Sequence, residues 1–99
     1  MNNPANNLLN TSSNYLQLMN KAEKVFGEAK YELSIRYYTL ALQQMASKVD
    51  IVYALYMRGC AYKAVGNLSK AKEDWKQAQN FNLEHPTGVD LIEMALTQV

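Results

Sequence analysis

The chain has 99 residues, the size of one domain, and 48% of them are hydrophobic, which is sufficient for a modest core. Ten basic and nine acidic residues leave a formal net charge of +1. This balance disfavours sequence-independent binding to nucleic acid and electrostatic binding to anionic membranes, because both require a strongly basic surface.

The sequence also lacks the usual signals for a membrane or secreted protein. No apolar run approaches the roughly 18 residues that a membrane-spanning helix needs, and the N-terminus has neither the basic start nor the apolar stretch of a secretory signal. The single cysteine, Cys60, cannot form an intrachain disulfide. We therefore expect a cytoplasmic protein that does not enter a membrane.

Residues 1–14 are rich in Asn and Ser, carry no charged side chain and show no periodicity. This composition is typical of a mobile tail, so the folded domain is expected to cover residues 15–99. The apolar pair Leu8 and Leu9 supports a second interpretation, in which the tail packs on a helix face or on a neighbouring chain.

Two helices are expected in the first half of the domain. The first starts after one of the polar residues 12–14, which are competent N-caps, and runs to about Gly27. The second runs from about residue 30 to residue 46 or 48 and is apolar on most sides, as in a helix packed between neighbours. In the connection that follows, Asp50 is expected to cap the third helix.

The third and fourth helices, at about residues 51–65 and 68–81, face each other across a tight turn at Gly66-Asn67. Gly66 accepts the left-handed conformation that ends many helices. Small residues at Gly59 and Ala71 let the two backbones approach closely, and large aromatic side chains fill the space beside them. One face carries the positions Leu55, Gly59 and Tyr62, and the facing helix carries Leu68, Ala71, Trp75 and Ala78.

A fifth helix is expected over residues 88–98. Pro86 blocks continuation of the fourth helix, and Thr87 with Asp90 has the spacing of a capping box. The apolar stripe of this segment suits a terminal helix that covers the last exposed apolar face of a repeat array.

The pattern of the central hairpin occurs a second time, 37 residues upstream. The upstream copy has the same spacing between its residues as the central hairpin. Its residues are Leu18, Ala22, Val25, Tyr31, Ser34, Tyr38 and Ala41. The upstream copy departs in two ways. Ala29 stands where the turn glycine is expected, with Gly27 two residues earlier, which leaves the turn geometry open, and the small residue Ser34 replaces an alanine.

This doubled pattern resembles the tetratricopeptide repeat, a helix–turn–helix unit of 34 residues, although the offset here is three residues longer. The resemblance implies an all-α superhelix of two helical hairpins, repeat 1 at about residues 15–48 and repeat 2 at about residues 52–85, with a capping helix at about residues 88–98. It also implies a non-catalytic protein-interaction module, an adaptor or scaffold that binds a protein segment in a concave groove.

In this family the groove is lined mainly by the first helix of each repeat. The equivalent positions here are Leu16, Met19, Glu23, Phe26, Tyr53, Tyr56, Cys60 and Lys63. This aromatic and apolar set, with one charge of each sign, suits an amphipathic helix or an extended peptide with apolar anchors. The alternative is that several of these side chains pack within the domain. The basic clamp with which some members hold the C-terminal carboxylate of chaperones is not matched, because Glu23 would repel a carboxylate.

Catalysis, metal binding and cofactor binding are not expected. Cys60 lies in the middle of a helix and His85 in a distant loop, no second Cys or His is available for a closed zinc site, and no glycine-rich phosphate loop is present. Two other hypotheses stay open. One is a self-assembling homodimer that buries the excess of aromatic side chains, since arrays of this kind usually contain about three repeats. The other is a redox or catalytic role for Cys60.

Overall fold

The computed structural model describes residues 4–44, 47–83 and 90–98 of the chain. These ranges contain five α-helices and no strand: α1 Pro4–Gly27, α2 Tyr31–Leu42, α3 Lys48–Ala64, α4 Leu68–Gln79 and α5 Leu91–Thr97. The predicted all-α class is confirmed. Among the described residues, none of the helices combines the length and the apolar character needed to cross a membrane.

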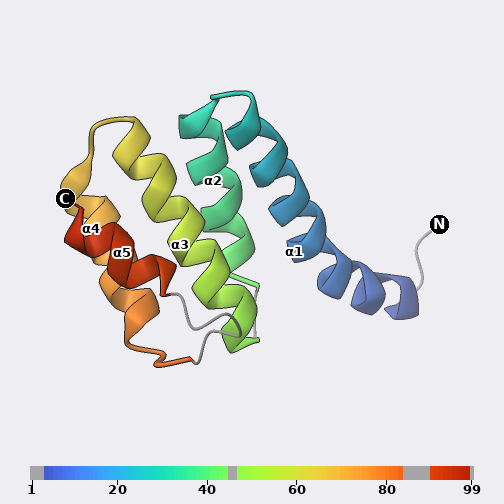
Figure 1. Cartoon of the computed structure of the whole chain (residues 1–99). Helices are drawn as coiled ribbons and strands as arrows, with labels where there is room; N and C mark the ends of the chain where they lie inside the picture. The colour runs from blue at the N-terminus through green and yellow to red at the C-terminus, as the bar shows by residue number, and fades with distance from the viewer. Residues whose placement is uncertain (1–3, 45–46, 84–89, 99) are drawn as a thin grey trace.

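The helices form two hairpins followed by a single short helix (Figure 1). α1 packs on α2, α3 packs on α4, and α2 also contacts α3, so that the hairpins lie side by side. The molecule measures 50 × 29 × 21 Å, and the N-terminal turns of α1 project beyond α2. α5 packs on α4 and buries Ile92 in the core of the second hairpin together with Val52, Leu55 and Trp75. The expected terminal helix is therefore present.

Both hairpin turns have the same hydrogen-bond pattern. In the second, the Gly66 amide donates to the Lys63 carbonyl and the Asn67 amide donates to the Tyr62 carbonyl, at 3.0 and 2.8 Å. In the first, the Ala29 amide donates to the Phe26 carbonyl and the Lys30 amide donates to the Val25 carbonyl, at 2.9 and 2.8 Å. This is the Schellman arrangement, which requires a left-handed residue after the helix.

The left-handed residue of each turn occupies the same place in the two hairpins. Gly66 has a φ of +85° and Ala29 a φ of +62°. The geometry that the sequence left open at Ala29 is thus the ordinary one, adopted by an alanine. Gly27 takes no part in it, because it remains within α1.

Close packing at the centre of each hairpin follows the predicted pairing of small and large residues. A Cβ atom on Gly59 would lie 2.4 Å from the indole nitrogen of Trp75, so no larger residue fits there without movement. In the first hairpin the equivalent residues, Ala22 and Tyr38, are fully buried in one cluster. The Ser34 hydroxyl donates to the Ala22 carbonyl at 3.0 Å, which accounts for a small polar residue at this buried position.

Several helix ends differ from the expected ones. α1 begins at Pro4, so the prediction of a start after residues 12–14 was wrong. Proline is well tolerated in the first turn of a helix, and extending an existing helix costs much less than nucleating one, so the poor helix formers of this segment do not end it. The mobility predicted for residues 1–14 stays a prediction. α2 ends at Leu42, before the expected boundary.

The starts of α3 and α5 also require correction. α3 begins at Lys48, with Ser47 at the N-cap position, so Asp50 lies inside its first turn and does not cap it. Asp90 is itself the N-cap of α5, and its side chain accepts hydrogen bonds from the amides of Ile92 and Glu93, both at 3.0 Å. Thr87, like His85 and Pro86, lies outside the described residues.

Candidate partner-binding site

Two tyrosine–carboxylate hydrogen bonds link α1 and α3, the first helices of the two hairpins. Tyr15 of α1 donates to Asp50 of α3 at 3.0 Å. Tyr53 of α3 donates in the opposite direction, to Glu23 of α1. Each helix therefore supplies one phenol and one carboxylate to the contacts between the helices that were predicted to line the groove.

Glu23, Tyr53 and the buried Tyr38 form a group that we call the Glu23 cluster. Tyr53 is 40% exposed, and its pKa is raised to about 12 by partial burial and by its hydrogen bond to Glu23. Tyr38 is fully buried, and this burial, together with the influence of the nearby Tyr53 and Glu23, raises the pKa of its phenol strongly. The Tyr38 hydroxyl makes no hydrogen bond within the described part of the chain.

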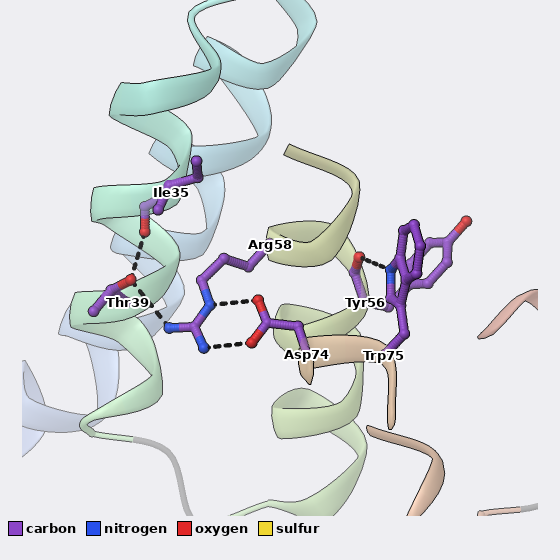
Figure 2. Close-up of polar contacts among 6 residues, drawn as sticks. All are labelled: Ile35, Thr39, Tyr56, Arg58, Asp74 and Trp75. Atoms are coloured by element: carbon purple, nitrogen blue, oxygen red, sulfur yellow. Dashed lines mark hydrogen bonds and ion pairs between the residues drawn. The ribbon is translucent and has the colours of Figure 1, made fainter. Parts of the chain in front are cut away.

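Further along α3, side chains of α3, α4 and α5 surround a pocket of about 200 Å³. It is lined by Tyr56, Cys60, Lys63, Trp75, Leu91, Met94, Ala95 and Gln98. We call it the α3–α5 pocket. The Trp75 indole donates to the backbone carbonyl of Tyr56 at 3.1 Å, which fixes the ring against α3 (Figure 2). Leu91 and Met94, which are 50% and 47% exposed, form the α5 side of the pocket.

Cys60 lines the α3–α5 pocket and is half-buried there. Burial raises its pKa, and this effect outweighs the opposing influence of the neighbouring Tyr56, Trp75 and Lys63 groups. A nucleophilic cysteine needs the reverse, a lowered pKa beside a base or a cation. Among the described residues, no group of three or more His, Cys, Asp or Glu side chains is arranged to hold a metal ion.

The eight predicted groove residues fall into three sets. Tyr56, Cys60 and Lys63 meet in the α3–α5 pocket, while Glu23 and Tyr53 meet in the Glu23 cluster. The other three are separate from both. Met19 is only 8% exposed and packs within the domain, Phe26 stacks edge-on against Tyr31 at 5.2 Å, and Leu16 is 52% exposed. Met19 therefore presents little surface to a partner.

The part of the site contributed by α5 was missed by sequence reasoning. Leu91 and Met94 were read only as part of a covering stripe, whereas Ile92 is the buried residue and its two neighbours on the stripe face the pocket. The helical spacing of three between Leu91 and Met94 was the available signal, since residues three apart share a face.

A second missed feature is a buried ion pair beside the site. Arg58 of α3 donates to both carboxylate oxygens of Asp74 on α4, at 2.8 and 2.6 Å, and to the Thr39 hydroxyl of α2 at 3.1 Å (Figure 2). Thr39 in turn donates to the Ile35 carbonyl at 2.7 Å. The network joins three helices, and Glu73, the neighbour of Asp74, is exposed at a small pocket that Arg58 and Asp74 also line.

Compared with known proteins, the chain matches no protein-family model, no curated protein and no solved structure.

Proposed function

We propose that the chain is a non-catalytic protein-interaction module of the tetratricopeptide-repeat kind. The two hairpins are its repeats and α5 is its terminal helix. The proposal is supported by equivalent contacts 37 residues apart. The paired positions are Ala22 with Gly59, Ala29 with Gly66, Ser34 with Ala71, and Tyr38 with Trp75. A cytoplasmic location, expected from the sequence, belongs to the same proposal.

The observation that carries the binding role is the α3–α5 pocket. Exposed large apolar side chains are common singly on protein surfaces, but Leu91 and Met94 flank a hollow whose other walls are the half-buried Tyr56 and the buried Trp75. A pocket of about 200 Å³ has room for one large apolar side chain of a peptide. Tyr and Met are residue types typical of such binding surfaces.

Peptide selection tests this proposal. A phage-displayed library of random linear peptides is selected on the immobilised chain, and an enriched peptide is measured by fluorescence anisotropy. We expect enriched peptides to share a large apolar residue. Met94→Lys should weaken binding about tenfold or more, because it places a charge where an apolar side chain is buried. Tyr56→Ala should weaken binding without unfolding, since its bond with Trp75 uses only the backbone.

The matched control is Leu40→Lys. Leu40 lies on α2, outside the pocket, and is 45% exposed, almost the same as Met94 at 47%. The control should leave peptide affinity within about twofold of the parent chain, as expected for an exposed surface change. Equal losses for Met94→Lys and Leu40→Lys, or selection that yields no shared motif, would contradict the proposal. Light scattering on the same samples reports whether a second copy of the chain covers the pocket instead.

A further inference from the structure

Glu23 is a carboxylate on the face of the proposed site that belongs to neither ion pair formed among the described residues. It is exposed on α1 and accepts a hydrogen bond from Tyr53. The ion pairs formed among the described residues, Lys30–Glu28 and Arg58–Asp74, do not include it. A carboxylate has about four acceptor positions, so one phenol leaves most of them open.

The surroundings of Glu23 add a further acceptor. Tyr53 places its phenol oxygen next to the carboxylate, and a phenol oxygen accepts as well as donates. Lysine and arginine side chains carry only donors and no acceptor, so they are the side chains that complement an acceptor-rich cluster.

The separation of the Glu23 cluster and the α3–α5 pocket along α3 follows from the positions that their residues occupy on this helix. Tyr53 precedes Tyr56 by three residues and Cys60 by seven on α3. At about 1.5 Å per residue, these steps correspond to roughly 4.5 and 10 Å along the helix axis. An extended peptide advances about 3.3 Å per residue, so side chains roughly two to four residues apart reach both places.

Lys63 places a positive charge on this face, at the opposite end from the negative charge of Glu23. It lines the far side of the α3–α5 pocket, ten positions after Tyr53 on α3, or about 15 Å along the axis. It is exposed and takes part in neither ion pair of the described residues. A basic residue of the partner is therefore attracted to the Glu23 end of the face and repelled from the Lys63 end.

We propose that the partner is a protein segment in which a lysine or arginine pairs with Glu23 and an apolar residue, two to four positions away, enters the α3–α5 pocket. This inference rests on the proposed function and deepens it by naming the chemistry of the partner. The basic residue selects and orients the segment, and the apolar residue supplies the buried area.

The test repeats the selection of linear peptides on four proteins: the parent chain, Glu23→Gln, Glu23→Lys and Glu73→Lys. Glutamine keeps an acceptor for the Tyr53 hydroxyl and removes only the charge. Glu73→Lys makes the same charge change as Glu23→Lys, but on an exposed face of α4. With the parent chain we expect a basic residue at a constant spacing from the apolar one. Glu23→Gln should weaken the best peptide about three- to tenfold, as for a partly exposed charged pair.

The charge reversal gives the most specific result. Peptides selected on Glu23→Lys should carry an acidic residue at the position where the parent chain selects a basic one, while Glu73→Lys should still select the basic residue. An apolar motif with no charge preference, unchanged by Glu23→Lys, would overturn this inference and leave the proposed function standing. The absence of any shared motif on the parent chain would overturn both.

Discussion

Ala29 carries backbone strain that its counterpart in the second hairpin avoids. Its φ of +62° brings the Cβ atom of an L-residue close to the following carbonyl oxygen, at a cost of roughly 1–2 kcal/mol. Gly66, with a φ of +85°, has no Cβ atom and therefore avoids this strain energy. The strain at Ala29 persists because the hydrogen bonds of the turn and the packing of α1 on α2 determine the conformation together.

We predict that Ala29→Gly stabilises the protein. The relief of strain exceeds the greater backbone entropy of glycine in the unfolded chain, so the free energy of unfolding should rise by about 0.5–1 kcal/mol. Urea denaturation followed by circular dichroism measures it. The matched variant is Gly66→Ala, which should lower the free energy of unfolding by about 1 kcal/mol or more at the equivalent turn. Changes of the same sign in both variants would contradict this account.

Gly59 shows a different use of glycine at the residue scale. Gly59 has an ordinary helical conformation. A glycine is needed there because the Trp75 ring occupies the space that a Cβ atom would fill. In the first hairpin the small residue is Ala22, which has one carbon atom more than glycine. The large residue is Tyr38, whose ring is smaller than the indole of Trp75. Small and large residues have therefore changed together between the two hairpins, as dense packing requires.

At the scale of the elements, the Arg58–Asp74 pair holds three helices in register. The side chains are 18% and 5% exposed, and the two parallel hydrogen bonds of the guanidinium, together with the bond to Thr39, satisfy much of the desolvated charge. A buried pair of this kind contributes little net stability compared with apolar residues, but losing one partner leaves a costly uncompensated charge.

We predict that Asp74→Ala lowers the free energy of unfolding by about 3 kcal/mol, because it leaves the Arg58 guanidinium partly buried without its counterion. Glu28→Gln is the comparison. It breaks the Lys30–Glu28 pair, whose side chains are 62% and 42% exposed, and should change stability by less than about 1 kcal/mol. Chemical denaturation of both variants measures the difference. Similar small effects in the two variants would show that Arg58 finds enough water to remain solvated.

For the whole molecule, the tyrosine phenols predict a loss of stability in alkali. Tyr53 titrates near pH 10 in the unfolded chain and at about 12 in the folded one, and Tyr38 is also shifted upward. A raised pKa means that folding favours the protonated phenol, so the stabilisation is complete below pH 10 and is lost as the pH rises from 10 to 12. The free energy of unfolding, measured across this range, should fall.

The variant Tyr53→Phe tests the origin of this pH dependence. It removes one of the shifted groups and should make the decline between pH 10 and pH 12 shallower. At neutral pH it should cost only the hydrogen bond to Glu23, which is exposed. Tyr31→Phe serves as the control, since its ring lies against Phe26, outside the Glu23 cluster, and its decline should match that of the parent chain. An unchanged slope in Tyr53→Phe would contradict the assignment.

The sequence by itself determined the helical class, the two hairpins, the turn at Gly66-Asn67 and the central packing residues. These features depend on contacts between residues at helical spacing. The sequence shows this spacing directly, because Gly59, Ala71, Tyr62 and Trp75 lie within one continuous stretch. The geometry of the first turn was left open by the sequence, because Ala29 stands where a glycine was expected, and the structure shows that this alanine adopts the left-handed conformation.

Only the tertiary structure decided which predicted residues meet. The bond between Tyr53 and Glu23, the ion pair of Arg58 with Asp74, and the α5 wall of the α3–α5 pocket join residues that are 16 or more positions apart. Helical periodicity places a side chain on a face of its own helix, but the partner across that face is set by how the helices pack. For the same reason Met19, a groove position by pattern, is buried in the folded chain.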